Sequence, residues 1–92
     1  MAQVVWLSEA IDQLDLIVAY IELFDPAAAQ RVRDRLVRTG ESLSDFPNRG
    51  RPVGDGIRQM TTVPPYVLSY EVVDDTAYIL GIRHGARRPL GG

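Results

Sequence analysis

The segment that decides the fold is YVLSYEVVDDTAYILGIR, residues 66–83. In its first half, large apolar and aromatic side chains stand at every second position: Tyr66, Leu68, Tyr70 and Val72. This period of two is typical of a strand with one buried face. Asp74-Asp75 is a tight-turn candidate, and Thr76–Arg83 is again rich in β-forming residues. We therefore predict two antiparallel strands, Tyr66–Val73 and Thr76–Arg83.

The residues on either side extend this sheet. Because Ile79 and Leu80 lie on opposite faces, Thr76–Arg83 is expected to be a central strand covered on both sides. A further strand, Arg58–Val63, is closed by Pro64-Pro65. Upstream of it, residues 47–56 hold two Pro and three Gly and are predicted to form a loop.

The first half of the chain predicts a short strand and two helices. Gln3–Leu7 is rich in β-formers, and Ser8 is the expected N-cap of the first helix. The apolar face of that helix recurs at helical spacing: Ile11, Leu14, Val18 and Ile21. Asp25-Pro26 ends this helix and begins the next, which should end near Gly40. The expected apolar face of the second helix is Ala29, Val32, Leu36 and Leu43.

The predicted order is therefore β-α-α-β-β-β in a single domain, residues 1–92. The link between the helices is so short that they must form an antiparallel hairpin. We expect an α+β fold in which this helical hairpin packs on a mostly antiparallel sheet.

Composition excludes several kinds of chemistry. The chain has 92 residues and a formal net charge of -2, and all ten basic residues are Arg. It has no Cys and one His, His84, so disulfides, thiolate nucleophiles and multi-His or Cys metal sites are excluded. Without Lys there is no Schiff-base chemistry. We expect no metal and no cofactor. The longest apolar run, Leu16–Ile21, is too short to span a membrane, and no signal-peptide pattern opens the chain, so a cytoplasmic location is expected.

Charge is unevenly distributed along the chain. Residues 1–30 carry five acidic residues and no basic one, whereas residues 31–92 carry every Arg. Arg recognises phosphate or carboxylate in bidentate fashion; the alternative is a solvated surface. The acidic first helix is read as a solvated face, or as a surface that attracts a basic segment of a partner.

The first helix carries a second apolar stripe on a different face, composed of Leu16, Ala19, Tyr20 and Leu23. One stripe is enough to cover a sheet. The favoured expectation is that the second stripe packs on the second helix. The alternative is that it contacts a partner segment.

Several segments, taken in order, resemble the ParE/RelE superfamily of bacterial type II toxins, and more closely the ParE branch. They are DLIVAYI (15–21), DPAAA (25–29), FPNRGRP (46–52), PYVLSY (65–70) and IRHGAR (82–87). The resemblance covers nearly the whole chain. It implies a toxin that is neutralised by a ParD-like antitoxin with a ribbon-helix-helix N-terminus. The second stripe would then be the antitoxin-binding surface.

The resemblance leaves two modes of action open. A RelE-like toxin is a ribosome-dependent mRNA endonuclease that activates the ribose 2′-OH without a metal; the candidate catalytic residues would be Arg58, His84 and Arg87. That branch usually carries an Arg three residues before the strand Tyr. Here Val67 stands three residues before Tyr70, and the usual Lys residues are absent.

A ParE-like toxin instead inhibits DNA gyrase by binding it, and this branch tolerates an apolar residue at the Val67 position. Gyrase inhibition is therefore the favoured interpretation. The target-binding residues would be basic: Arg49, Arg51, Arg83, His84, Arg87 and Arg88. A third possibility is a family member that binds its antitoxin without being toxic. The target, the oligomeric state of the toxin–antitoxin complex and the residues that the antitoxin masks are not determined by the sequence.

Overall fold

A computed structural model describes residues 1–85 of the chain. Its elements are β1 (Gln3–Trp6), α1 (Ser8–Glu22), α2 (Pro26–Glu41), the short 3-10 helix η1 (Ser42–Ser44), β2 (Arg51–Gly54), β3 (Ile57–Val63), β4 (Tyr66–Val73) and β5 (Thr76–His84). The order β-α-α-β-β-β is confirmed, with one additional strand, β2. No helix of the described part is long and apolar enough to cross a membrane.

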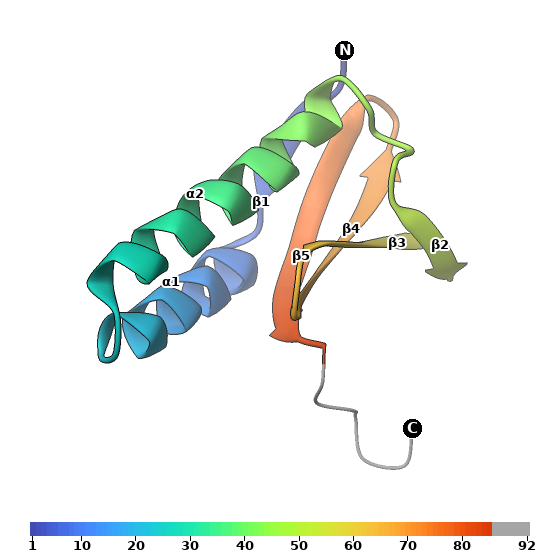
Figure 1. The fold of residues 1–92 in the computed structure, drawn as a ribbon. Coiled ribbons are helices and arrows are strands. Elements are labelled where there is room, and N and C mark those ends of the chain that lie inside the picture. The colour runs from blue at the N-terminus through green and yellow to red at the C-terminus, as the bar shows by residue number, and fades with distance from the viewer. Residues whose placement is uncertain (86–92) are drawn as a thin grey trace.

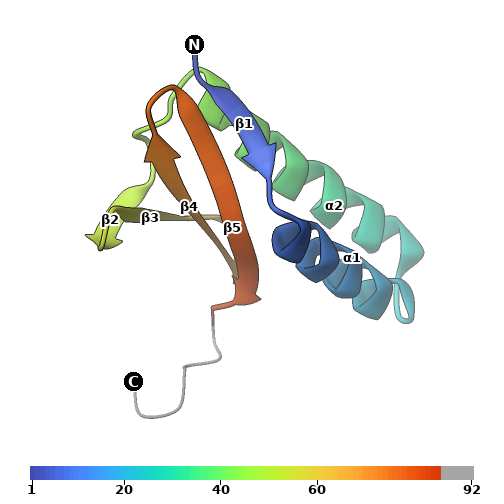
Figure 2. The same cartoon turned by 180° about the vertical axis from the view of Figure 1, so that it is seen from behind.

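The strands form one mixed sheet in the order β1-β5-β4-β3-β2. β1 pairs with β5 in parallel, and the other neighbours are antiparallel. The antiparallel helices α1 and α2 lie together on one side of the sheet, and β3 and β2 curve away from β4 and β5 (Figures 1 and 2). The predicted helical hairpin on a mostly antiparallel sheet is thus confirmed.

The expectation that β5 is covered on both sides is wrong. β5 does lie inside the sheet, but both helices lie on one face of it (Figure 2). Tyr70 pairs with Ile79 and Ser69 with Gly81, which leaves Leu80 in a β-bulge. A bulge inserts a residue that breaks the alternation of side chains, so Ile79 is buried and Leu80 is only half-buried.

The prediction that residues 47–56 are entirely loop is also wrong, because Arg51–Gly54 forms β2 at the edge of the sheet. An edge strand tolerates Pro52, since its missing N–H need not serve the sheet. Asp55 and Gly56 both have positive φ, 55° and 76°. This is the geometry of the two-residue turn that an Asp-Gly pair favours in hairpins, and it joins β2 to β3.

The core lies between the helices and the sheet. α1 contributes Ala10, Leu14 and Val18 to it. The predicted face of α1 is therefore partly wrong, because Ile11 is exposed and Ala10 is buried in its place. Ser8 is the first residue of α1 and does not cap it; the N-cap is Leu7, which makes no side-chain hydrogen bond.

The second helix follows its prediction closely. The Asp25 carboxylate accepts a hydrogen bond from the N–H of Ala28 at 3.0 Å, and Pro26 occupies the first turn. Ala29 and Leu36 are buried on α2 and Leu43 is buried on η1, while Val32 packs against the core at partial burial. The helix ends one residue after Gly40, as expected.

Candidate partner-binding and target-binding surfaces

The second stripe of α1 is exposed. Leu16, Tyr20 and Leu23 are 71%, 65% and 78% accessible, and Ala19 is also exposed. The expectation that this stripe packs on α2 is therefore wrong. At 100° per residue, these positions project away from the face formed by Ala10, Leu14 and Val18. An exposed ion pair joins the two helices at their rim, where the Asp15 carboxylate lies 3.5 Å from Arg33.

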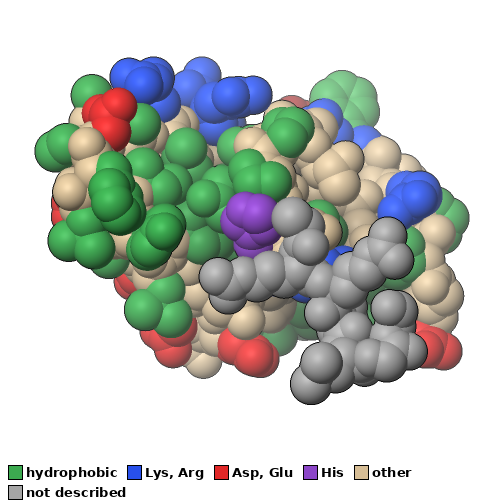
Figure 3. Space-filling view, turned by 60° about the horizontal axis from the view of Figure 1, so that its bottom comes forward, with side chains coloured by type: hydrophobic (Ala, Val, Ile, Leu, Met, Phe, Trp, Pro, Cys, Tyr) green, Lys and Arg blue, Asp and Glu red, His purple; other side chains and the backbone are tan. Residues whose placement is uncertain are grey.

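Phe24 extends the second stripe beyond the end of α1. Its ring is 73% accessible and meets the Tyr20 ring edge-on, with the ring centroids 5.4 Å apart. Monomeric proteins rarely leave contiguous apolar surface of this kind uncovered. Figure 3 shows hydrophobic side chains gathered over one side of the view and continuing to the single His.

His84 therefore borders this apolar surface. It ends β5, is half-buried, and pairs with Tyr66 across the sheet, with the two rings edge-on at 5.7 Å. The same end of β5 is fixed to α1, because the Gln13 side-chain oxygen accepts a hydrogen bond from the N–H of Ile82 at 2.7 Å. Gly81 allows this approach, since a Cβ there would lie 2.7 Å from that oxygen.

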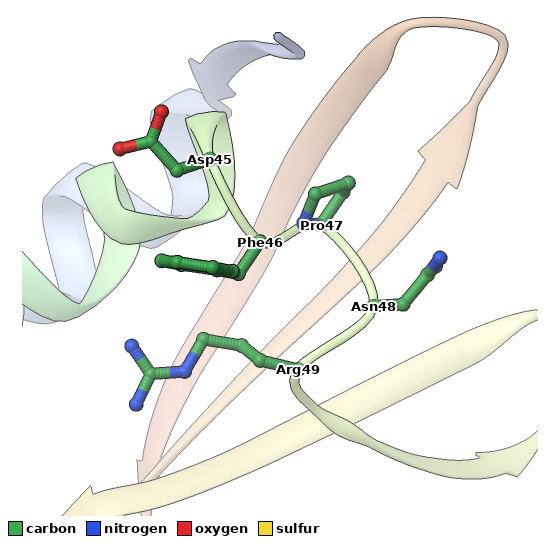
Figure 4. Close-up of a pocket in the computed structure, with 5 residues that line it drawn as sticks. All are labelled: Asp45, Phe46, Pro47, Asn48 and Arg49. Carbon is green, nitrogen blue, oxygen red and sulfur yellow. The ribbon is translucent and has the colours of Figure 1, made fainter.

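The loop of residues 45–50 is built around the buried Tyr70. The Tyr70 hydroxyl donates to the Pro47 carbonyl at 2.8 Å and accepts from the Gly50 N–H at 2.9 Å. Arg58 donates from Nη1 to the carbonyls of Asn48 and Gly50, at 3.1 and 2.7 Å. A shallow pocket is lined by residues 45–49, and Figure 4 shows the Phe46 and Arg49 side chains projecting from this loop in the same direction.

The candidate nuclease residues do not converge in the described part of the chain. Arg58 pairs with Tyr70, and His84 pairs with Tyr66, four residues away along β4. On the rise and spacing of β-strands, the Cα atoms of Arg58 and His84 are roughly 16 Å apart. Arg58 is also engaged with two loop carbonyls. The third candidate, Arg87, lies outside the described residues.

The candidate target-binding residues fall on different surfaces. Arg51 is in register with Gln59, Ser69 and Gly81 across the sheet. Arg51 and Arg83 are both exposed: Arg51 lies on the edge strand β2, and Arg83 stands opposite Val67 of β4. His84 points to the helix side, and Arg49 donates to the Ser42 hydroxyl at 2.7 Å. Arg87 and Arg88 lie outside the described residues.

Sequence reasoning missed several residues of these surfaces. Phe24 follows Tyr20 by four positions, a helical spacing that could have added it to the second stripe. Phe46 directly precedes the segment 47–56 that predicted a loop, and an aromatic residue beside a predicted surface loop could have been considered as a binding residue. The hydrogen bond between Gln13 and Ile82 of β5 has no local sequence signal, because these two residues are far apart in the sequence.

Together, the fold and surfaces define a small α+β domain with an uncovered apolar helix face and dispersed Arg side chains, a combination suited to binding other macromolecules. Comparison with known proteins gives its family. The model of the ParE toxin of the type II toxin–antitoxin system parDE matches residues 4–89. The chain belongs to this family, within the ParE/RelE superfamily of type II toxins.

Individual relatives agree with this assignment. Toxin RelE2 of Caulobacter vibrioides is 46% identical over 87 residues, covering 95% of this chain and 99% of that protein. Putative toxin Y4kP of Sinorhizobium fredii is 36% identical and covers 86% of this chain and 83% of that protein. Among solved structures, the chromosomal ParDE system from P. aeruginosa superposes with a TM-score of 0.82 at 25% identity, covering 91% and 96% of the two chains.

Proposed function

We propose that the chain is a ParE-like toxin that inhibits DNA gyrase by binding it and is neutralised by a ParD-like antitoxin. The observation that carries the antitoxin part of the proposal is the exposed second stripe of α1, with Leu16, Tyr20 and Leu23 each more than half accessible. Such a surface suits an apolar segment of an antitoxin. The name of the structural relative, a ParDE system, supports the same partner.

Binding rather than cleavage is supported by the distribution of the polar side chains. Transesterification at a ribose needs a base, an acid and a cation gathered around one phosphate. Within residues 1–85, Arg58 and His84 stand on separate parts of the sheet, and Arg58 anchors the loop. Val67, at the position where the nuclease branch carries an Arg, is buried and faces Arg83 across the strands.

Expression with and without the antitoxin encoded by a neighbouring reading frame tests toxicity. We expect growth arrest that the antitoxin relieves; unimpeded growth would instead favour the non-toxic, antitoxin-binding alternative. Purified chain should then inhibit supercoiling by DNA gyrase and leave ribosome-bound mRNA intact. Cleaved mRNA with unaffected supercoiling would overturn the gyrase proposal.

The antitoxin surface is tested separately with Leu16→Glu and Leu23→Glu. Both side chains are exposed, so the variants should fold normally. A charge buried under an apolar partner segment is costly, so antitoxin affinity should fall by at least a hundred-fold, or about 2.7 kcal/mol. Ala27→Glu, on the exposed first turn of α2, is the matched control. Unchanged affinity in both Leu variants would remove the second stripe from the interface.

A RelE-like ribosome-dependent mRNA endonuclease remains the second candidate. It is favoured by the name of the relative with 46% identity, Toxin RelE2. The two assays above distinguish it directly. Loss of cleavage in Arg87→Ala, with supercoiling unaffected in every variant, would support this second candidate.

A further inference from the structure

We propose that α2 and the loop that follows η1 form a binding surface for single-stranded nucleic acid. Four Arg side chains provide contacts to phosphate, and the Phe46 ring provides a platform for one base. The four are called here the basic row: Arg31, Arg35, Arg38 and Arg49. This surface is distinct from the second stripe of α1, and the proposal does not depend on whether gyrase is the target.

The geometry of α2 aligns the basic row. Arg31, Arg35 and Arg38 follow the spacing i, i+4, i+7, which keeps them within roughly 60° of one another around the helix. The next position of the series, Ser42, has no charge, but its hydroxyl accepts a hydrogen bond from Arg49 at 2.7 Å. Arg49 thereby completes a row about 16 Å long at 1.5 Å per residue.

The guanidinium groups of this row are available to a ligand. All four side chains belong to exposed residues, and within residues 1–85 none of them has a carboxylate within 4.0 Å. Their protein contacts are to neutral oxygens: Arg35 to the Thr62 carbonyl and Arg38 to the Asp34 carbonyl, both at 3.4 Å. Arg33, by contrast, lies on the α1 side of the same helix and is paired with Asp15. Figure 3 shows Arg side chains gathered along one margin of the molecule.

An exposed aromatic ring stands at the end of the basic row. Phe46 is 63% accessible, and in the described part of the chain its ring contacts no other aromatic ring. Figure 4 shows it beside the Arg49 side chain, over the pocket that both residues line. The loop backbone is held in place, because Tyr70 and Arg58 together bond four of its groups: the carbonyls of Pro47, Asn48 and Gly50 and the N–H of Gly50. The backbone that carries the ring is therefore fixed to the core of the protein.

A row of Arg followed by an aromatic ring is the combination that recognises a single strand. Arg contacts phosphates in bidentate fashion, and unstacked bases stack on aromatic side chains for about 1–3 kcal/mol each. A duplex keeps its bases stacked and would leave Phe46 unused. An acidic protein segment would match the charges but has no base for the ring. The observations therefore favour a nucleic-acid strand over an acidic polypeptide.

Binding of labelled oligonucleotides of about 15 nucleotides to the purified full chain tests the proposal. A single-stranded DNA, an RNA of the same sequence and the duplex are compared at several salt concentrations. We expect both single strands to bind more tightly than the duplex. With four phosphate contacts, the slope of log K against log salt should be about −3. The strand that binds more tightly shows whether the surface prefers RNA or DNA.

Matched variants assign the binding to this surface. Arg31→Gln combined with Arg38→Gln should reduce the salt slope by about 1 to 1.5, whereas Arg33→Gln on the opposite side of α2 should leave it unchanged. Phe46→Ala should weaken single-strand binding roughly ten-fold, and Phe24→Ala, which removes a comparably exposed ring elsewhere, should not. The proposal is overturned if no strand binds at low salt, if polyglutamate competes as well as the oligonucleotides, or if Phe46→Ala has no effect.

Discussion

The Tyr70 hydroxyl accepts a hydrogen bond from the Gly50 N–H at 2.9 Å, and the two residues are so close that a Cβ on Gly50 would lie 2.6 Å from the Tyr70 ring. This contact joins the middle of the sheet to the loop that carries Phe46 and Arg49. Tyr70 is fully buried, and its hydroxyl also donates to the Pro47 carbonyl at 2.8 Å. One core side chain thus bonds two points of the loop of residues 45–50.

Replacing Tyr70 with Phe should destabilise the protein by about 1–3 kcal/mol, because the Gly50 N–H and the Pro47 carbonyl lose their partner while the ring still fills the core. Urea unfolding followed by circular dichroism measures the change. Tyr78→Phe, on a half-buried position of β5, is the control and should change stability by less than about 0.5 kcal/mol. Equal effects in the two variants would contradict the role given to Tyr70.

Much of this fold follows from local patterns. The period of two in β4 and the Asp-Pro junction between the helices each rest on contacts within a few residues. The bounds of β4 and the first residue of α2 are therefore predicted correctly from the sequence. β2 was missed because Pro52 and Gly54 suggest a loop, whereas its place at the sheet edge removes the penalty for Pro. The β5 bulge depends on register with β4, which local periodicity does not encode.

The functional surfaces were predicted less completely than the fold. The second stripe is visible in the sequence, but whether it is covered depends on how α1 is rotated against the sheet. In the observed rotation, the small residue Ala10 is buried in the core and the larger Ile11 is exposed. Arg83 and His84 are neighbours on β5, so the alternation of side chains along the strand places them on opposite faces of the sheet. Sequence identifies the side chains, and the packing decides which of them share a surface.

Gly40→Ala should destabilise the protein even though Ala favours helices. A Cβ at this position would collide with the Trp6 ring and would lie 2.8 Å from Ile79 Cδ1. Overpacking of this kind costs about 1–3 kcal/mol, which exceeds the helix gain of at most about 1 kcal/mol. Urea unfolding measures the loss, and emission from Trp6, the single Trp, should report the displaced ring.

A second substitution makes the Gly40 prediction specific. Trp6→Phe removes the ring atoms that the new Cβ would meet, so adding Gly40→Ala to Trp6→Phe should cost less than adding it to the parent chain. The double-mutant cycle should therefore show coupling of about 1 kcal/mol. Strictly additive effects, measured by circular dichroism, would mean that Trp6 does not limit the space at Gly40.

The contact between Gln13 and Ile82 should be visible in amide hydrogen exchange. Gln13→Ala removes the acceptor of the Ile82 N–H, so this amide should exchange faster, and stability should fall by about 1 kcal/mol. Gln13→Glu retains a side-chain oxygen and should retain most of the protection at neutral pH. If Ile82 remains equally protected in Gln13→Ala, then another group accepts this hydrogen bond and α1 does not fix the end of β5.

Arg58 should behave as a structural residue and not as a catalytic one. Arg58→Met keeps the apolar stem but removes the donor to the Asn48 and Gly50 carbonyls, and should cost about 1–3 kcal/mol. Arg51→Met, on the exposed edge strand β2, is the stability control. The Arg58→Met variant should arrest growth less than the parent chain only to the extent that less of it is folded. Urea unfolding and the amount of soluble protein in cells measure the folded fraction. A variant that is as stable as the parent chain and yet non-toxic would show that the Arg58 guanidinium acts on the target itself.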